Sequence, residues 1–543
     1  MGEPLVRLVE DIYTQSTTSI LTEEGVSVPI PIFSGVKQGC PLSGLLFNIT
    51  IDPVMREIQG DNASHQILAF ADDICLIANS PGELQVRLNE APHLLGRLHL
   101  TLNPGKSFSF HLHGTTPVGV VATEFFLGAN RLSPLVEGEF HRFLGKPVGF
   151  NPVPDYSSLS DLADLGTKLT PWQRLDALKS FFFPCLQFPM RTAQFPKEDW
   201  ARIDRLLRRD LKDTLNLPME ASNEYLYGER RLGCCGIPLA AEEADINLLD
   251  TAFKLLTSRD GLCASEAFSA LTSTVQRRLG RFPDDATLGA FMSGQVEGEF
   301  STTSNRLSNT WTVARVASRR LGICWSFEES SPSLSFADLT LRANSRRKIL
   351  FSIRDRLRSA RSTALLRKRN QGKSMEVVSL SPASSHFISN GAYTRFADWR
   401  FVHRARLNLV PLNGLKMGIG DAGGVVSNRK RWHMWARKLA HYEPLLPLYQ
   451  AQGLQPQIVP FLVGALGSWD PQKDPFLRRF MSRSYLNTFR RLCVSDSIKW
   501  SRDIYVEFLT GHKQYSTTED VRIEPTDLAV VYSPPESQLV SPA

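Results

Sequence analysis

The sequence lacks the features that mark secreted, membrane-spanning and repeat proteins. Its eight cysteines are scattered over 543 residues without the spacing of a disulfide framework, so we expect a reducing compartment. No apolar run is long enough to cross a bilayer, and the first residues, MGEPLVRLVED, have no basic start followed by an apolar core. No internal repeat occurs. We therefore expect a soluble, intracellular protein with no membrane partner.

The composition is that of a globular protein with a modest basic excess. Hydrophobic residues make up 42% of the chain, enough for packed cores, and the length suggests roughly three to four domains. The formal charge is +7, which suits a polyanionic partner but is also common among ordinary proteins. Charge alone does not select a function.

Two adjacent aspartates stand between short apolar runs in AFADDICLIA, residues 69–78. Both runs are β-prone, so they predict a tight hairpin, followed by a helix that starts at Ser80 with a capping box to Glu83. Asp72 and Asp73 have two interpretations. They form either an ordinary solvated turn or, because both flanking runs look buried and would hold the turn rigidly, a site for divalent cations.

Two other stretches have weaker signals for phosphate chemistry. In GVKQGCPLSG, residues 35–44, the glycines allow close approach of a ligand and Gln38 offers an amide donor and acceptor, although the start of an ordinary glycine-rich helix fits as well. The helix that follows should kink or break at Pro53, and the later helix should kink at Pro92. In LNPGKSFSF, residues 102–110, Lys106 follows a Pro-Gly turn, where it is either solvated or able to reach phosphates or donate a proton.

The rest of the chain is predicted to be mostly helical, with basic faces. Residues 172–217 predict helices with a core stripe made of Ile203, Leu206, Leu207, Leu211 and Leu215. The basic residues that lie mostly off this stripe are Arg202, Arg205, Arg208, Arg209 and Lys212. Residues 342–373 contain twelve basic residues and a single acid, Asp355. Each basic segment is either a solvated helix face or a surface for nucleic acid.

Four stretches, GVKQGCPLSGLLFN, AFADDICLIA, LNPGKSF and FLGKPVGF, resemble in order and spacing the palm motifs of reverse transcriptases from non-LTR retrotransposons. The resemblance implies that Asp72 is a metal-binding catalytic carboxylate with Asp73 beside it, and that the cofactor is Mg²⁺, or Mn²⁺ in its place. It implies that Lys106 protonates the pyrophosphate leaving group. The residues implied to line the nucleotide and template pocket are Lys37, Gln38, Gly39, Phe70 and Ala71. The implied primer grip is the turn of Phe143, Leu144 and Gly145.

The resemblance extends to elements of this class that insert into ribosomal RNA genes. RIDRLLRRDLKDTLNLP, EYLYGERRLGCCGIPL and FVHRARLNLVPLNG look like their thumb and linker, while FLVGALGSWDP and LCVSDSIKWSRDIYVEF are similar to the end of their restriction-like endonuclease domain. The implied fold is α+β, a partial palm with an antiparallel sheet and packed helices, then a mostly helical thumb and linker. The implied segments are partial fingers and palm (1–150), thumb (151–245), basic helical linker (246–390), linker end and endonuclease remnant (391–525) and a disordered tail (526–543). The residues implied to contact nucleic-acid backbone are Arg205, Arg208, Arg209, Lys212, Arg346, Arg347 and Lys348.

One catalytic part of the family pattern is missing from the sequence. The family has another metal-binding aspartate upstream of its KQG motif, and Met1 falls after that point. Glu10 and Asp11 do not replace it, because their stretch looks helical and resembles the segment that follows the missing motif. Since loss of a ligand shared by two metal ions is severe, we expect impaired activity and an incomplete, internally deleted chain.

The zinc and nuclease parts of the pattern are missing as well. No cysteine occurs between Cys324 and Cys493, so we expect no zinc site of the family's cysteine-histidine type. We expect Asp470 to form a turn and Glu507 to be a surface or ion-pair residue, and assign neither to a nuclease.

The sequence therefore predicts an RNA-directed DNA polymerase, a nucleotidyltransferase that copies element RNA from a DNA primer at the target with deoxynucleoside triphosphates. The family implies a nuclear location. The alternative is a non-catalytic RNA- or DNA-binding relic of the element. An enzyme of the group II intron maturase type shares the palm motifs, but GALGSWDP and SRDIYVEF argue against it. An ordinary helical scaffold would require the ordered motifs to be a coincidence.

Overall fold

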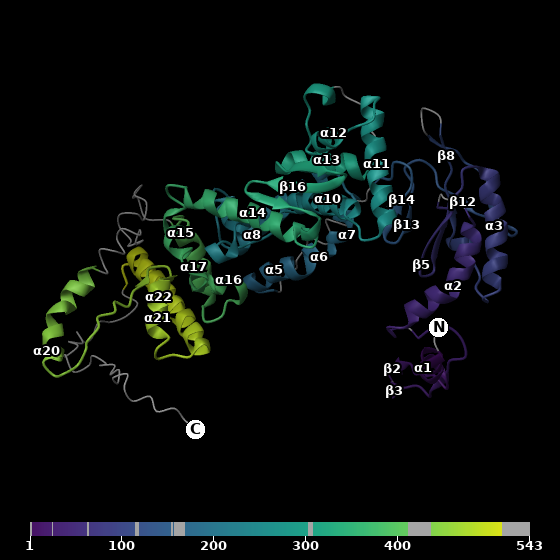
Figure 1. The fold of residues 1–543 in the computed structure, drawn as a ribbon. Helices are drawn as coiled ribbons and strands as arrows, with labels where there is room; N and C mark the ends of the chain where they lie inside the picture. The colour runs from purple at the N-terminus through teal and green to yellow at the C-terminus, as the bar shows by residue number, and fades with distance from the viewer. Residues whose placement is uncertain are drawn as a thin grey trace. The chain divides into compact units, whose positions relative to one another are not determined.

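The chain forms two compact units, Met1–Pro154 and Asp155–Ala543. The computed structural model describes residues 3–23, 25–37, 39–61, 65–114, 119–153, 156, 169–301, 308–410 and 436–512 (Figure 1). Gln38 and the predicted tail, 526–543, lie outside the described residues. No helix in these ranges is long and apolar enough to cross a membrane.

The first unit combines three helices with short strands. The helices are α1 (Glu3–Tyr13), α2 (Ser43–Gln59), α3 (Pro81–Gly96) and the 3-10 turn η1 (Pro104–Lys106). The strands are β1 (Thr17–Thr18), β2 (Leu21–Thr22), β3 (Gly25–Val26), β4 (Ile30–Pro31), β5 (Ile67–Phe70), β6 (Asp73–Leu76), β7 (Phe108–Ser109), β8 (Leu112–His113), β9 (Gly119–Val120), β10 (Phe126–Leu127), β11 (Asn130–Arg131), β12 (Ser133–Pro134), β13 (His141–Phe143) and β14 (Lys146–Val148). All pair as two-stranded ladders, antiparallel except for β7 with β12. The described residues thus contain separate two-stranded ladders where the sequence predicted one antiparallel palm sheet.

The core of the first unit lies between α2 and α3, which lie side by side (Figure 1). Ile51 and Val54 from α2 meet Leu94 and Leu95 from α3. Pro53 lies inside α2 and Pro92 inside α3, and neither ends its helix, so a break at Pro53 does not occur. Each proline removes one backbone donor, and the apolar contacts on both sides of it offset that loss.

The second unit is mostly helical. Its first helices are α5 (Pro171–Ala177), the π turn η2 (Leu178–Phe182), α6 (Phe183–Cys185), α7 (Gln187–Arg191), α8 (Lys197–Thr214), α9 (Asn223–Tyr227) and η3 (Arg230–Leu232). Next come α10 (Ala240–Leu256), α11 (Gly261–Leu279), α12 (Asp285–Met292), η4 (Gly298–Phe300) and α13 (Thr310–Leu321), then the antiparallel sheet β15 (Cys324–Glu328), β16 (Ser331–Phe336) and β17 (Leu339–Leu341). The chain continues through η5 (Ala343–Ser345), α14 (Ile349–Leu366), α15 (Lys373–Val378), η6 (Pro382–Ser385), α16 (Phe387–Asn390) and α17 (Phe396–Arg406).

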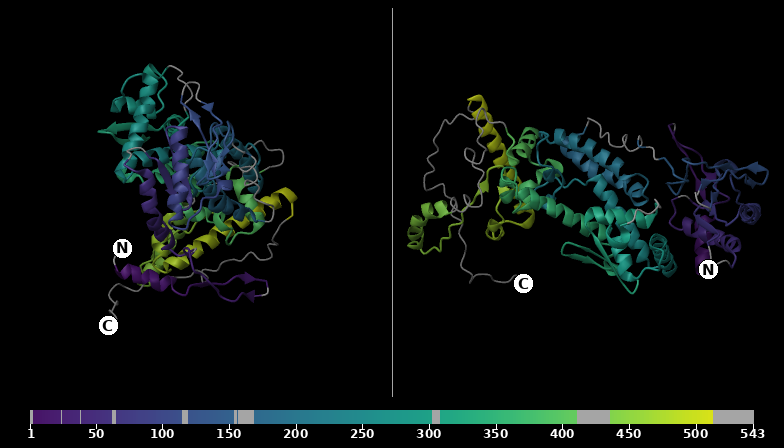
Figure 2. Two further views of the ribbon diagram at one scale, coloured as in Figure 1. Left: turned by 90° about the vertical axis from the view of Figure 1, so that its right-hand side faces the viewer. Right: turned by 90° about the horizontal axis from the view of Figure 1, so that it is seen from above.

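The last described elements end in a long helix. They are η7 (Glu443–Leu445), α20 (Leu446–Gln450), the pair β18 (Val463–Gly464) and β19 (Ser468–Trp469), η8 (Pro471–Lys473), α21 (Asp474–Leu477) and α22 (Arg483–Thr510). Helix α22 is the long yellow helix in Figures 1 and 2. Asp470 caps η8 by accepting a hydrogen bond from the Gln472 N–H at 3.1 Å, which confirms its prediction as a turn former.

Two hydrophobic clusters divide the second unit differently from the segments that the sequence predicted. One combines residues 175–244 with residues 365–407 and 469–498, so the predicted thumb and the C-terminal elements share a core. The other lies within residues 246–353 and includes the three-stranded sheet. Helix α10 contributes Ala240 and Ala244 to the first cluster and Ile246 and Leu249 to the second.

Helix α8 shows where the predicted stripe is wrong. Ile203, Leu207 and Leu211 are buried as predicted, but the Leu206 side chain is 46% exposed. It lies one residue, or about 100° around the helix, from Leu207. The buried side instead takes in Asp204 and Lys212, next to the predicted leucines.

Candidate metal and nucleic-acid site

The two aspartates lie at the tip of the β5–β6 hairpin, which the sequence predicted. Phe70 pairs with Asp73, so Ala71 and Asp72 form a two-residue loop. Both carboxylates are exposed. Ala71 has a φ of 50°, in the left-handed region, which costs a non-glycine residue about 1–2 kcal/mol. Backbone strain of this kind gathers at functional sites, so the hairpin tip is a candidate for one.

The hairpin is packed on one face only. Ile74 of β6 contacts the cluster between α2 and α3, and Leu76 contacts a second cluster made of Leu88 of α3 and residues 125–132. On the other face, Leu68 is 46% exposed and Phe70 is 67% exposed. The expectation that both strands are buried is therefore wrong, because a two-stranded ladder has no neighbouring strands and only one face meets the helices.

The start of α3 fixes the end of β6. Ser80 accepts a hydrogen bond from the Glu83 N–H at 3.3 Å, while Glu83 accepts one from the Asn79 N–H at 3.0 Å. The buried Arg87 bonds both Glu83 and the carbonyl oxygen of Ile77. These bonds tie the helix to the strand that carries Asp73.

The glycine-rich loop before α2 is anchored to α1 through Lys37. The Lys37 ammonium donates to the Ile12 carbonyl oxygen at 2.7 Å, and its backbone N–H donates to the Tyr13 hydroxyl at 3.3 Å. Gly39 has a φ of +86°, and a Cβ added there would meet nothing within 4 Å. The loop therefore leaves open space at Gly39, and Lys37 holds its start in place.

Lys106 and the predicted primer grip are linked by a stacked pair of rings. Lys106 is the exposed last residue of η1, which Asn103 caps. Phe108, just after it, stacks on His141 of β13 with 4.2 Å between ring centroids. Phe143 pairs with Lys146, so Leu144 and Gly145, with φ of 50° and 77°, form a two-residue turn. Two positive φ values are typical of a type I′ hairpin turn, which twists with its strands.

The described residues supply two carboxylates at the hairpin and no larger metal cluster. They contain no group of three or more His, Cys, Asp or Glu side chains placed to hold a metal ion. Asp72 and Asp73 form no salt bridge within this part of the chain, so their oxygens are available to a cation. Carboxylate oxygens are the ligands that Mg²⁺ prefers.

The basic residues of α8 divide into exposed and buried ones. Arg205 and Arg209 are exposed, while Arg208 donates to the Tyr227 hydroxyl at 3.2 Å. Lys212 is buried, and its ammonium donates to the carbonyl oxygens of Met219 at 2.6 Å and Ala221 at 2.8 Å. Burial also lowers its pKa. Lys212 therefore stabilises the turn after α8 through these hydrogen bonds. Because it is buried, it cannot make the predicted contact with nucleic acid.

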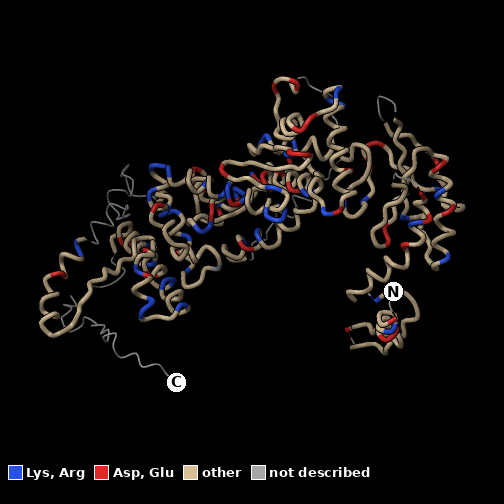
Figure 3. The backbone as a smooth tube through the Cα atoms, viewed as in Figure 1, with Lys and Arg blue, Asp and Glu red and all other residues tan. Residues whose placement is uncertain are grey.

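Acids from other elements neutralise much of the basic segment on α14. Arg354 pairs with Glu243 at 2.5 Å, Arg361 pairs with Glu242, and Arg356 pairs with Asp338 at 2.7 Å. Blue and red residues are accordingly intermixed there (Figure 3). The acidic residues of α10 are about 100 positions away from α14 in the sequence, so a count of charged residues within 342–373 does not include them.

Three predicted contacts lie at the start of this segment. Arg346 donates to the Lys254 carbonyl oxygen at 3.1 Å, and Arg347 and Lys348 are exposed. Other exposed arginines, at positions 478 and 483, were not among the predicted site residues, although the pairs Arg478-Arg479 and Arg490-Arg491 were a signal for them.

Comparison with known proteins gives the class of the hairpin-bearing unit. Residues 5–145 match the reverse transcriptase (RNA-dependent DNA polymerase) family, a range that contains the Asp72 hairpin, Lys106 and the turn at Leu144. The first unit is thus a reverse transcriptase domain.

More specifically, the chain is a distant homologue of the reverse transcriptases of R2-type non-LTR retrotransposons, to which it is similar over about 43% of its length. It is 28% identical over 249 residues to the Pol polyprotein of the type-2 retrotransposable element R2DM of Drosophila melanogaster, covering 43% of this chain and 23% of that protein. It is also 28% identical to the polyproteins of the type-1 element R2 of Bradysia coprophila, over 43% of this chain and 28% of that protein, and of Popillia japonica, over 41% and 34%. The matches thus span about a quarter to a third of these relatives.

Proposed function

We propose that the chain takes part in RNA-templated DNA synthesis, as an RNA-directed DNA polymerase of an R2-type retrotransposon. The observation that carries the proposal is the strained, exposed hairpin tip with Asp72 and Asp73, inside the segment that matches the reverse transcriptase family. In this reaction a primer 3′ hydroxyl attacks the α-phosphate of a deoxynucleoside triphosphate and pyrophosphate leaves.

The hairpin fits Mg²⁺ in the kind of ligand it offers. Asp72 and Asp73 present adjacent, exposed carboxylates, and both would hold the ion. The ion, when bound, supplies charge that activates the attacking oxygen and stabilises the leaving one. Because the described residues provide two carboxylates and no third ligand nearby, we expect weak synthesis by this chain alone.

The other residues of these motifs would act in binding and proton transfer. Lys106, exposed at the end of η1, would protonate the pyrophosphate leaving group. The exposed Phe70 and the strained Ala71 flank the carboxylates and would contact the incoming nucleotide. The open backbone at Gly39, together with Gln38, would lie along the template, and the turn of Phe143, Leu144 and Gly145 would support the primer end.

The partners and location follow from the same proposal. We propose an element RNA as template, a DNA primer at the target, a nuclear location, and a relation of residues 463–510 to the end of the family's endonuclease domain. The exposed Arg205, Arg209, Arg347 and Lys348 would contact the nucleic-acid backbone, where affinity falls steeply with salt.

A non-catalytic nucleic-acid-binding relic is the second candidate. The absence of a three-ligand metal cluster among the described residues favours it. This candidate predicts salt-dependent binding without synthesis that depends on Mg²⁺.

Primer extension on an RNA template separates the two candidates. The samples are this chain and a version extended at its N-terminus with the family's aspartate motif, each with and without Asp72→Ala, and all with Mg²⁺ and deoxynucleotides. We expect the extended version to synthesise DNA, this chain to do so weakly, and Asp72→Ala to be inactive in both backgrounds. If all versions bind the template and none synthesises DNA, the non-catalytic relic is supported. Full activity of Asp72→Ala would refute the assigned site.

A further inference from the structure

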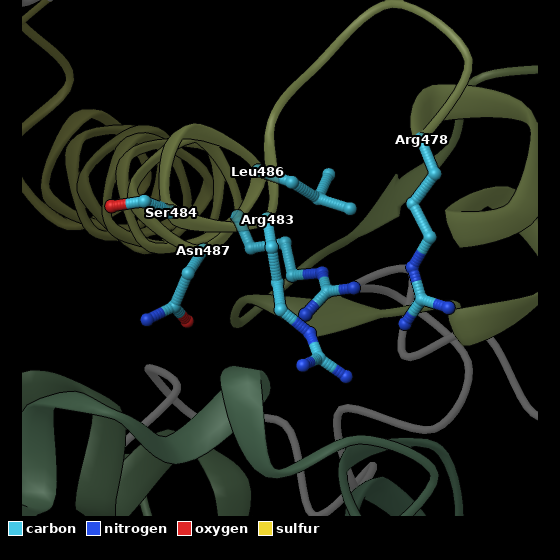
Figure 4. A pocket seen from close by; sticks show the side chains of 6 residues that line it. Arg478, Arg483, Ser484, Leu486 and Asn487 are labelled. Atoms are coloured by element: carbon cyan, nitrogen blue, oxygen red, sulfur yellow. The ribbon is translucent and has the colours of Figure 1, made fainter.

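The start of α22 lines a cavity rich in arginine. The cavity has a volume of about 460 Å³, and the residues that line it are Arg478, Arg483, Ser484, Leu486, Asn487 and Arg490. Figure 4 shows the side chains of Arg478 and Arg483 extending into the same space. Three of the six lining residues carry a positive charge and none carries a negative one.

A second cavity is lined in part by the same residues. It has a volume of about 440 Å³ and shares Asn487 and Arg490 with its neighbour. Its other arginines are Arg230 and Arg231 of η3 and Arg491 of α22. Serine hydroxyls and His386 from η6 and α16 complete the lining, again without an acid. We call the two cavities together, with their six arginines, the arginine groove.

Structural ion pairs account for only two of these six charges. Arg490 pairs with Asp474 at 2.6 Å, and Arg231 pairs with Glu229 at 2.5 Å. No salt bridge within the described residues involves the other four, which are Arg230, Arg478, Arg483 and Arg491. These four charges repel one another across a concave surface, and the amino-terminal end of α22 adds further positive potential.

A chain of phosphates fits this surface better than a single small anion. Arginine forms paired hydrogen bonds with phosphate oxygens, and here the arginines come from separate elements and line two cavities that share Asn487 and Arg490. The hydroxyls of Ser381, Ser389 and Ser484 and the amide of Asn487 offer neutral donors along the same path.

We propose that the arginine groove binds the phosphodiester backbone of a nucleic-acid strand, at a site separate from the Asp72 hairpin. The choice of nucleic acid over other polyanions rests on the proposed function. The groove itself rests only on the cavities and their unpaired charges, and its binding needs neither Mg²⁺ nor nucleotides.

The test is a fluorescence-anisotropy titration of the full chain in EDTA, over a series of salt concentrations. The probes are a labelled 20-nucleotide RNA, DNA of the same sequence, and the DNA duplex. The variant is Arg478→Gln/Arg483→Gln. Its matched control, Arg259→Gln/Arg277→Gln, removes the same charge from exposed arginines that also form no salt bridge among the described residues.

We expect the groove variant to bind at least one probe about tenfold more weakly than the control variant. Its slope of log affinity against log salt should fall in magnitude by about 1.4 for a single strand, as expected for two lost phosphate contacts. An Arg478→Lys/Arg483→Lys variant should keep the slope because it keeps the charge. The probe most affected identifies RNA, single-stranded DNA or duplex as the natural strand.

Two results would overturn the proposal. Equal losses in the groove and control variants would show that net charge alone governs binding. Displacement of the RNA by poly-glutamate at matched charge would assign the groove to acidic proteins. Since both arginines are exposed, circular dichroism should show the variants folded. Asp72→Ala should bind like the unchanged chain, so failure of the groove and failure of the polymerase assignment remain distinguishable.

Discussion

At the scale of single residues, burial distinguishes a lysine with a structural role from basic residues that are exposed to solvent. Lys212 and Arg209 lie three residues apart on α8, but the first is buried and bonded to two carbonyl oxygens while the second is exposed. Sequence periodicity placed both outside the core stripe. Removing the Lys212 side chain should therefore lower the free energy of unfolding more than removing that of Arg209.

We predict that Lys212→Ala lowers the free energy of unfolding of the second unit by about 1–3 kcal/mol, because the carbonyl oxygens of Met219 and Ala221 lose their donor. Arg209→Ala should stay within about 0.5 kcal/mol of the unchanged protein. Urea unfolding followed by tryptophan fluorescence measures both. If Lys212→Ala binds nucleic acid more weakly while its free energy of unfolding is unchanged, Lys212 contacts nucleic acid and has no structural role.

At the scale of elements, α17 contains a histidine that folding keeps neutral. His403 is fully buried and shares a 2.7 Å hydrogen bond between its Nδ1 and the Tyr225 hydroxyl. The Trp399 ring lies 4.3 Å from it, centroid to centroid. Burial first, and the charge of Arg406 second, lower the pKa of His403 to about 3.

We predict that stability falls as the pH drops from about 6.5 toward 3. In this range the unfolded chain binds a proton at His403 that the folded chain does not, so acid favours unfolding. A His403→Gln variant should show a smaller fall, measured as the melting temperature against pH. His441→Gln, a change at an exposed histidine, is the control and should follow the unchanged protein. Parallel curves for all three proteins would contradict the assignment.

Local elements were predictable from the sequence, and long-range pairings were not. The turn between Phe70 and Asp73 and the cap at Ser80 depend on neighbouring residues, and both form as predicted. The exposed face of the hairpin and the pairing of Arg361 with Glu242 depend on which elements meet, which no local pattern records. The candidate aspartates were found from their context, but the arginine groove joins residues about 250 positions apart and was missed.

At the scale of the whole molecule, α10 joins the two clusters of the second unit. Asp245 lies on α10 between them and is 1% exposed. It pairs with Lys197 of α8 and, at 2.9 Å, with Arg320 of α13. The Asp245 carboxylate thus links α8 of the first cluster and α13 of the second to α10, the helix that both clusters share.

We predict that Asp245→Ala lowers the free energy of unfolding by about 2–3 kcal/mol, because two partly buried cations lose their partner. Asp338→Ala, which breaks the exposed pair with Arg356, should cost at most about 1 kcal/mol. Urea unfolding compares them. An equal loss of unfolding free energy in the two variants would mean that Asp245 does not hold the clusters together.

The central claim is that the β5–β6 hairpin tip is the metal-binding part of a reverse transcriptase centre. The most direct measurement is Mn²⁺ binding to the full chain with a deoxynucleoside triphosphate, followed by electron paramagnetic resonance, for the unchanged protein, Asp72→Asn and the control Asp61→Asn, an exposed aspartate beyond α2. We predict that Asp72→Asn weakens Mn²⁺ binding at least about tenfold, while Asp61→Asn leaves it unchanged. Equal binding by all three proteins would contradict it.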